Sequence, residues 1–253
     1  MNQFNDSSHT MILSEDGSFT AYSKEYDEHY HSTKDGALHE SLVKHVIPTQ
    51  ELKKDKKEVH ILDICYGLGF NTLATLLYYQ KEHSTSKIYI YSPELDAQLI
   101  SSLVNFTYPK EFEIYRPIIK ALSNVEKYED ERVKIEIFLG DAREYVRRFE
   151  NKFDIVYQDA FSPSTNPILW TQEYFKDIKN AMKKDGVLST YSISLPTRLA
   201  LYENGFNLYL NEGKGYRSAT LASPKLLESL KLVDVEHKIA CNPNVESLKD
   251  KNI

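Results

Sequence analysis

The sequence of 253 residues predicts an α/β domain with a mostly parallel central sheet and one antiparallel strand near its carboxyl end. Two observations support this class. Between residues 59 and 203, short apolar runs alternate with amphipathic segments, as strands and helices do in a parallel sheet. After them, strands expected near 206–210 and 216–222 are joined by Asn211-Glu-Gly-Lys-Gly215, which is typical of a hairpin and therefore of an antiparallel strand.

The expected elements follow in order along the chain. Residues 9–22 alternate around Asp16-Gly17 and predict a hairpin. Residues 35–46 have apolar positions at helical spacing, and we expect that helix to stop before Pro48. The core is predicted from strands 59–64, 87–91, 134–139, 153–158 and 187–192 and helices 70–80, 95–105, 142–149, 170–183 and 195–203. We interpret 107–132 as an insertion and expect one helix after 224.

We therefore divide the chain into an N-terminal extension (1–58), a core (59–223) and a C-terminal helix with a polar tail (224–253). The net charge of −6 argues against a general nucleic-acid coat, although it leaves room for a local basic patch. No window approaches a membrane span, and the polar start MNQFNDSSHT has no signal-peptide core. The two cysteines, Cys65 and Cys241, are far apart in the sequence and neither belongs to a C-x-x-C motif, which favours a reduced cytoplasmic protein. The sequence has no cluster of metal-ligating residues, so we expect no metal.

The stretch from Val59 to Leu73 predicts a cofactor corner. An apolar run ends in Asp63, Gly67 and Gly69 follow, and a helical pattern then begins, which indicates a buried strand, a tight turn and a helix N-terminus. Glycine lets the backbone approach a ligand where a Cβ would block it. Thr72 stands where a dinucleotide fingerprint has its third glycine, so the turn favours a nucleotide-type cofactor other than a dinucleotide.

Three acids follow consecutive strands of the predicted sheet: Asp63, Glu94 and Asp141. Ligands of open α/β sheets bind beyond the carboxyl ends of the strands, so these acids are expected to face one ligand. A carboxylate accepts from two donors and suits ribose hydroxyls, which we assign to Glu94 with Asp96 as a rival. Each acid also has a structural alternative, as a turn-holding residue or a helix cap.

The fourth strand ends at Asp159, which Phe161 and a proline-bounded loop follow. A carboxylate at this position suits an amine nucleophile, because the amine must lose a proton before it attacks. Phe161 can stack on a base. The alternative is that Asp159 caps the loop, and for Trp170 we prefer a core role. His31 is interpreted as a hydrogen-bonding or surface histidine rather than a base, and Glu40 as either facing the site or solvated.

Two blocks of the sequence resemble the MnmC-like methyltransferase family: Asp63-Ile-Cys-Tyr-Gly-Leu-Gly-Phe-Asn-Thr-Leu73, and Asp159-Ala-Phe-Ser-Pro with Asn166-Pro-Ile-Leu-Trp-Thr171. The resemblance runs from about His9 to Ala222. It implies the Rossmann-like sheet of class I S-adenosylmethionine (AdoMet)-dependent methyltransferases, with an N-terminal extension. That family includes the methyltransferase half of a bifunctional tRNA 5-methylaminomethyl-2-thiouridine biosynthesis protein. The FAD-dependent oxidase half has no counterpart here, so we expect a stand-alone form.

The resemblance also implies roles for residues and a reaction. Asp159 would be catalytic, and the cofactor would be AdoMet, held by Asp63, Gly67, Gly69, Asn71, Glu94, Asp141 and Ala142. From residue type alone, substrate contacts are expected from Tyr30, Phe161, Arg198 and Arg217. The two arginines, with Lys214, are candidates for phosphate contacts, and the alternative for each is an ordinary surface charge. The reaction would be N-methylation of the 5-aminomethyl group on a wobble uridine of tRNA. Thiolation of the uridine, the tRNAs used, the source of the aminomethyl group, the oligomeric state and the need for a partner stay open.

Two other functions remain as alternatives. An aminopropyltransferase of the spermidine synthase type shares the sheet and the acids at its strand ends, but its first turn would carry a longer glycine run than Gly67-Leu68-Gly69. A cofactor-binding, RNA-associated subunit without turnover is the second alternative, since a fold alone does not establish catalysis. The presence of Asp159 beside all three cofactor acids favours an enzyme.

Overall fold

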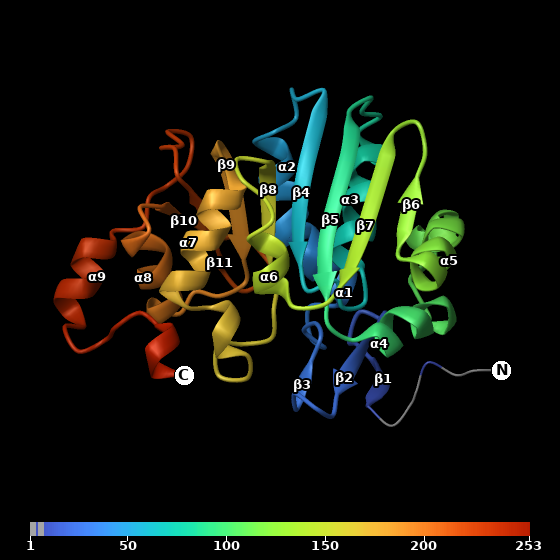
Figure 1. The fold of residues 1–253 in the computed structure, drawn as a ribbon, viewed down its shortest axis with the longest axis horizontal. Coiled ribbons are helices and arrows are strands. Elements are labelled where there is room, and N and C mark those ends of the chain that lie inside the picture. Colours follow the sequence, from blue (N-terminus) through green and yellow to red (C-terminus); the bar gives the residue numbers. More distant parts are fainter. Residues whose placement is uncertain (1–3, 5–7) are drawn as a thin grey trace.

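An eight-stranded sheet forms the centre of the computed structural model, which describes residue 4 and residues 8–253 (Figure 1). From one edge to the other, its strands are β10 (Asn207–Asn211), β11 (Ala219–Ser223), β9 (Met182–Thr190), β8 (Phe153–Gln158), β4 (Glu58–Ile64), β5 (Lys87–Glu94), β7 (Val133–Leu139) and β6 (Lys127–Glu129). The five strands from β9 to β7 are parallel, whereas β11 is antiparallel to both neighbours. The predicted fold class and its antiparallel strand are confirmed.

The order of the strands reverses at β4, which pairs with β5 on one side and β8 on the other. Connections on the two sides of such a point leave in opposite directions, and a crevice opens at the carboxyl ends of the strands. The predicted glycine turn follows β4 directly, and Asp159 follows β8 directly. The topology therefore brings two distant segments of the sequence to one edge of the sheet.

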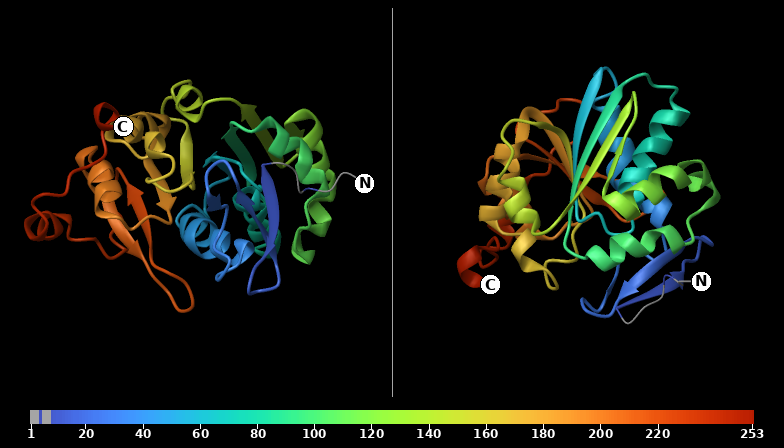
Figure 2. Two further views of the ribbon diagram at one scale, coloured as in Figure 1. Left: turned by 90° about the horizontal axis from the view of Figure 1, so that it is seen from below. Right: turned by 45° about the vertical axis from the view of Figure 1, so that its right-hand side comes forward.

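Helices cover both faces of the sheet (Figure 2). Neighbouring residues of a strand point to opposite faces, and Ile61 and Leu62 accordingly belong to different apolar clusters. The cluster of Ile61 includes helical residues of α1 (Ala37–Glu40), η1 (Ser41–Val46), α3 (Phe70–Lys81), α4 (Ala97–Ser102) and α5 (Arg116–Val125). The cluster of Leu62 includes residues of α6 (Ala142–Val146), α7 (Gln172–Ala181), α8 (Leu195–Glu203) and α9 (Val235–Cys241).

A small antiparallel sheet lies at the carboxyl ends of the parallel strands (Figure 1). It consists of β1 (His9–Leu13), β2 (Phe19–Ser23) and β3 (Glu28–His29), so the predicted hairpin is confirmed and gains a third strand. The first residues, for which the sequence predicts no signal peptide, fall largely outside the described residues. In the part that the structure describes, no helix is long and apolar enough to cross a membrane. The division of the chain into three parts stays a prediction.

The helix predicted to stop before Pro48 continues, so that prediction is wrong. A π-helical segment, η1, follows α1 and leads into α2 (Ile47–Glu51), in whose first turn Pro48 lies. Proline is tolerated in a first turn because its missing N–H has no obligatory partner there. In π spacing, the amide of residue 48 would bond to the Val43 carbonyl, which instead accepts from Asn211 Nδ2 at 2.9 Å.

Residues 107–132, predicted as an insertion, contain regular structure. The short helix η3 (Lys110–Tyr115) leads into α5, and β6 then pairs with the edge of β7. Helix α5 buries Ile118, Ile119 and Leu122, whose spacing is that of one helix face. Three more short helices complete the described chain: η2 (Leu103–Asn105), η4 (Pro167–Leu169) and η5 (Asp250–Asn252). Helix α9 is the helix expected after 224.

Candidate active site

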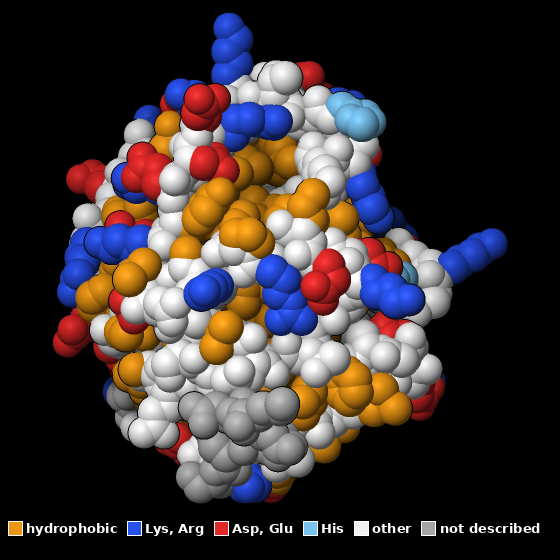
Figure 3. All heavy atoms as spheres, turned by 90° about the vertical axis from the view of Figure 1, so that its right-hand side faces the viewer, with side chains coloured by type: hydrophobic (Ala, Val, Ile, Leu, Met, Phe, Trp, Pro, Cys, Tyr) orange, Lys and Arg blue, Asp and Glu red, His pale blue; other side chains and the backbone are white. Residues whose placement is uncertain are grey.

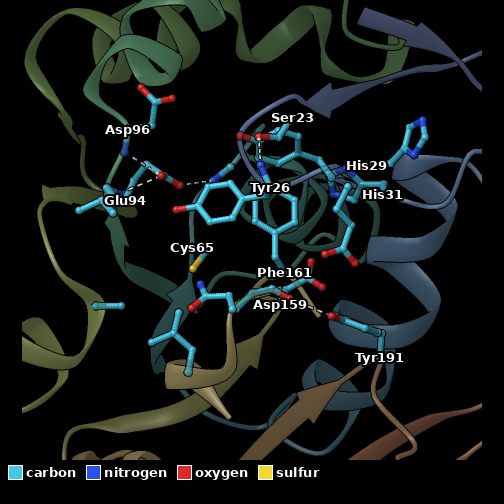
Figure 4. A pocket seen from close by; sticks show the side chains of 18 of the residues that line it. Ser23, Tyr26, His29, His31, Cys65, Glu94, Asp96, Asp159, Phe161 and Tyr191 are labelled. Carbon is cyan, nitrogen blue, oxygen red and sulfur yellow. Dashed lines mark hydrogen bonds between the residues drawn. The ribbon is translucent and has the colours of Figure 1, made fainter. Parts of the chain in front are cut away.

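A cavity of about 1140 Å³ opens between the carboxyl ends of the parallel strands and the small N-terminal sheet. Eight of the predicted site residues line it: Tyr30, Gly67, Glu94, Asp141, Ala142, Asp159, Phe161 and Arg217. Glu94 and Asp96 lie on one side of the cavity and Asp159 and Tyr191 on the other (Figure 4). The structure thus brings most of the predicted site together from segments spread over nearly 190 positions of the sequence.

The turn after β4 depends on a left-handed backbone. Cys65, Gly67 and Gly69 all have positive φ, of 63°, 53° and 76°. A Cβ on Gly67 would lie 3.1 Å from Tyr30 Cδ1, and a Cβ on Gly69 would lie 2.6 Å from the Tyr66 hydroxyl. Both positions therefore require glycine for conformation and for space, and the ring of Tyr30 lies against the turn.

Glu94, at the end of β5, fastens this turn. Its Oε2 accepts from the Gly67 amide at 2.9 Å, and its Oε1 accepts from the amides of Leu95 and Asp96. Burial raises the pKa of the Glu94 carboxyl, and the three backbone hydrogen bonds partly offset that rise. Asp96 instead caps α4, because its carboxylate accepts from the Leu99 amide at 2.8 Å. Both side chains line the cavity, and Oε2 of Glu94 keeps a further lone pair for a ligand hydroxyl.

Asp141 lies at the end of β7 and caps α6, since its Oδ1 accepts from the Glu144 amide at 2.9 Å. The capping interpretation is therefore confirmed. Asp141 and Ala142 also line the cavity, so a cap and a ligand contact are compatible at this position.

Two predicted cofactor residues, Asp63 and Asn71, lie behind the cavity wall. Asp63 is 1% exposed, and its carboxylate accepts from Thr72 Oγ1 at 2.8 Å and Asn71 Nδ2 at 3.4 Å. Burial raises the pKa of the Asp63 carboxyl to about 7. A direct contact of Asp63 with a ligand is not supported, because the side chain is enclosed; it orients Asn71 instead. Gly69 also lies behind the wall, as the N-cap of α3.

Arg198 is the predicted substrate residue that the structure does not bring to the cavity. Its side chain is buried, and its Nε donates to Thr220 Oγ1 at 3.1 Å. Burial lowers the pKa of the Arg198 guanidinium, but the group stays charged because the ordinary pKa of arginine is so high. An enclosed arginine cannot reach a phosphate in solvent, so this predicted contact is not supported. Arg217 does line the cavity.

Asp159 lines the cavity on the side opposite Glu94 (Figure 4). Its Oδ2 accepts from Asn71 Nδ2 at 2.8 Å, and its Oδ1 lies 3.4 Å from His45 Nε2. Burial alone would raise the pKa of the Asp159 carboxyl, but the charges of His45 and His31 and the amide of Asn71 outweigh it and hold that pKa well below its ordinary value. Asp159 is therefore an anion that faces the cavity.

Aromatic rings cover the cavity above Asp159. Phe161 stacks on Tyr26, with ring centroids 4.7 Å apart and an angle of 26° between the planes, and Tyr30 lies 5.0 Å away. Trp170 is fully buried, as predicted, and its Nε1 donates to the Phe161 carbonyl at 2.8 Å. The core tryptophan thus fixes the loop that carries Phe161.

Sequence reasoning missed His45, which η1 carries into the core beside Asp159. A signal for the burial of His45, though not for its partner, was available: position 45 falls on the apolar face of the predicted helix, where a polar residue is unusual. Lys44, also missed, is buried at the cavity and paired with Glu40 and Asp35. Glu40 lines the cavity, which agrees with the interpretation that it faces the site. His31 is buried against Phe70, and its Nδ1 lies 3.5 Å from Thr20 Oγ1, in agreement with a hydrogen-bonding role.

Comparisons with known proteins agree with this geometry. The crystal structure of MnmC2 from Aquifex aeolicus has a TM-score of 0.81 and 33% identity, over 99% of this chain and 81% of that one. A family model described as S-adenosyl-L-methionine-dependent methyltransferase matches residues 111–225. The chain belongs to the MnmC-like methyltransferase family. It is an AdoMet-dependent methyltransferase, and this membership favours methyl transfer over the two alternatives.

Longer relatives are also similar to this chain. An uncharacterized protein of Methanocaldococcus jannaschii is 32% identical over 218 residues, which are 85% of this chain and 59% of that protein. The tRNA 5-methylaminomethyl-2-thiouridine biosynthesis bifunctional protein MnmC of Leptospira interrogans is 27% identical over 237 residues, 86% of this chain and 36% of that protein. The chain therefore spans about three fifths of the first relative and about a third of the second.

The residues at the cavity fit AdoMet. The left-handed turn at Gly67 leaves room where a Cβ would meet Tyr30, and Glu94 and Asp141 offer acceptors at successive strand ends. Asn71 Oδ1 is buried without a hydrogen-bond partner in the part of the chain that the structure describes. Because Asn71 lies behind the cavity wall, this oxygen is not counted among the acceptors that line the cavity.

Proposed function

We propose that this chain transfers a methyl group from AdoMet to the nitrogen of a 5-aminomethyl group on a wobble uridine of tRNA. The observation that carries the proposal is the carboxylate of Asp159, which lines the cavity beside the aromatic rings of Phe161, Tyr26 and Tyr30. The names of the bifunctional relatives, which concern 5-methylaminomethyl-2-thiouridine in tRNA, supply the substrate class.

Asp159 would bind and orient the amine. The free amine donates an N–H to the carboxylate, and this hydrogen bond directs the lone pair of the amine nitrogen into the cavity. When bound, AdoMet supplies a methyl group on a sulfonium, so the new C–N bond forms as the C–S bond breaks and sulfur keeps the electron pair. The methylated product is a secondary ammonium, and Asp159 stabilises that charge until one proton leaves to water.

The charge of the cavity lining suits cationic reactants. Its acids, which are Glu25, Glu28, Asp35, Glu40, Glu94, Asp96, Asp141 and Asp159, outnumber its bases, which are Lys34, Lys44 and Arg217. A sulfonium and an ammonium are both attracted to such a lining. A carboxylated side chain on the uridine would be disfavoured for the same reason.

The nucleic acid would approach from the cavity side. The face over α5 and β6 carries charges of both signs with apolar side chains between them (Figure 3). Such a mixed face is a poor match for a phosphate backbone, which binds clustered cations. Lys34 and Arg217 line the same cavity as the aromatic rings of Tyr26 and Phe161, which suit an unstacked base.

Transfer of label tests this function. The purified protein is incubated with methyl-labelled AdoMet and bulk tRNA from cells that cannot make the methylaminomethyl group, and the tRNA is digested to nucleosides. We expect label in a 5-methylaminomethyl-uridine derivative and none in a tRNA transcript without the aminomethyl group. Label in another nucleoside, or none despite measured AdoMet binding, would contradict the proposal.

A further inference from the structure

His45 is buried directly behind Asp159 and does not itself line the cavity. Its side chain has no exposed surface, and it comes from η1, the π-helical segment that leads into α2. Short π-helical segments inside helices occur often at functional sites, because the wider turn moves a side chain off the regular helical face. Here Pro48 and the bond from Asn211 to the Val43 carbonyl favour that wider turn.

Two contacts fix the imidazole ring. Its Nδ1 lies 3.0 Å from Ser189 Oγ on β9, and its edge meets the ring of Tyr157 on β8, with centroids 5.9 Å apart at 73°. These contacts leave Nε2 pointing toward the Asp159 carboxylate, 3.4 Å from Oδ1. Within the described residues Nε2 has no well-formed hydrogen bond of its own. A ring held on one nitrogen presents the other in a fixed direction.

We propose that His45 is a positioning residue of methyl transfer: held by Ser189, it donates from Nε2 to Asp159, fixes the direction of that carboxylate and, when its ring is protonated, balances the charge of that carboxylate. The inference rests on the proposed function for its role in catalysis. It assigns no proton transfer to His45, which touches neither the amine nor the cofactor side of the cavity. The carboxylate is thereby kept as an acceptor for the amine at neutral pH.

Several other titratable groups face Asp159 and enter the expected pH dependence. They come from each element packed around it and are His31 after β3, Glu40 on α1, Asp63 on β4, Cys65 in the glycine turn and Tyr191 after β9. The acids among them raise the pKa of Asp159, and His31 opposes that rise. Of the groups that oppose it, His45 lies at the distance of an ion pair, so its removal should be felt most.

The His45→Gln variant tests the proposal through a pH profile. Glutamine keeps an N–H donor near the position of Nε2 but carries no charge. We expect the rate constant of transfer at saturating tRNA to fall about tenfold or more at pH 7, with AdoMet affinity nearly unchanged. The acidic limb of the profile should move to higher pH, because Asp159 without a neighbouring cation protonates more readily.

The His60→Gln variant is the matched control. His60 is a partly buried histidine of β4 whose ring stacks on Tyr89, away from the cavity. It should leave the profile unmoved. A purely structural role of His45 would lower the rate equally at all pH values, and such parallel profiles would overturn the inference while leaving the proposed function intact.

A second measurement keeps the proposal testable where His45→Gln does not fold or no tRNA is methylated. The ¹⁵N chemical shifts of the histidine rings are recorded for the protein without ligands and for Asp159→Asn. We expect the shifts of the His45 ring to move by several parts per million and those of His60 to stay. Unmoved His45 shifts would contradict the contact itself, whatever the activity assay gives.

Discussion

The two ends of strand β8 each carry a buried carboxylate, Asp154 at the start and Asp159 just past the end, and their surroundings differ. Asp154 is fully buried and binds Lys183 Nζ at 2.8 Å, Lys56 Nζ and the His60 amide. Asp159 has the Asn71 amide and the His45 ring, and 16% of its side chain is exposed to the cavity. One carboxylate has a complete set of fixed partners, and the other has an oxygen surface left for a ligand.

Both environments lower the pKa of a carboxyl group, but only the environment of Asp159 leaves that group accessible from the cavity. Burial would raise the pKa of Asp154, and hydrogen bonds from Lys183 and Lys56 outweigh it. Asp63 lies on the neighbouring strand and has only neutral donors, so its pKa rises. A buried carboxylate thus stays charged where a cation balances it, and of Asp63, Asp154 and Asp159 only Asp159 lines the cavity.

The largest effect is expected from Gly67→Val, which fills part of the cavity at the carboxyl end of the strands. A β-branched residue at a φ of 53° is strained, and its Cβ would lie 3.1 Å from Tyr30 Cδ1. We expect no AdoMet binding by isothermal titration calorimetry. Gly17→Val is the control, since Gly17 has a φ of 81° and open space around its Cβ position. Normal AdoMet binding by Gly67→Val would remove the turn from the cofactor site.

Asp63→Asn sharpens the difference between cationic and neutral partners. With a raised pKa, folded Asp63 binds more protons than the unfolded chain, so its contribution to stability falls as pH rises from about 4 to about 7, by at most about 1.4 kcal/mol per pH unit. The variant should lose that slope in urea unfolding. Asp159→Asn should change the slope only below about pH 4, because its folded pKa is lowered. Equal slopes for wild type and Asp63→Asn would contradict the raised pKa.

Asp154→Ala tests the closed end. It leaves Lys56 and Lys183 without their shared partner, and we expect a loss of about 2–3 kcal/mol in the free energy of unfolding, since both lysines are partly exposed. Glu129→Ala, which removes an exposed partner of Lys134, should change it by less than about 1 kcal/mol. The comparison would break if Asp154→Ala were as harmless as Glu129→Ala and impaired transfer instead.

The smallest effect is expected from Phe161→Leu, which removes a stacking ring and keeps an apolar side chain. A lost stacking contact of about 1 kcal/mol would raise KM for tRNA roughly fivefold. Phe149→Leu, in an aromatic cluster outside the cavity lining, should leave KM unchanged. A fall in AdoMet affinity with an unchanged KM for tRNA would instead move Phe161 to the cofactor.

Local patterns predicted the sheet and its edge well. Strand β4, the glycine turn and α3 follow from an apolar run, two glycines and a helical repeat that lie within 25 positions. The meeting of Asp159 with the turn follows from topology, because parallel strands bring their carboxyl ends together. These inferences need periodicity and chain order but no side-chain contact.

What the sequence did not predict depends on contacts between distant residues. Pro48 suggested a helix end, yet the helix continues. The Asn211 side chain, 163 positions after Pro48, donates the hydrogen bond to the Val43 carbonyl. Arg198 looked available to a phosphate, but α8 turns it toward Thr220. The partnership of His45 with Asp159 joins residues 114 positions apart, and a single sequence contains no signal for such a pair.

One measurement on Asp159→Asn tests the central claim, that the open carboxylate of β8 serves transfer and not cofactor binding. AdoMet affinity, the free energy of unfolding and the rate constant of methyl transfer to tRNA are determined on one preparation. We predict AdoMet affinity close to wild type, a lower free energy of unfolding at pH 7, because the lowered folded pKa of Asp159 makes its ionised form stabilising, and a transfer rate lowered about 10²- to 10⁴-fold. Equal losses in cofactor binding and transfer, or undiminished transfer, would contradict the account.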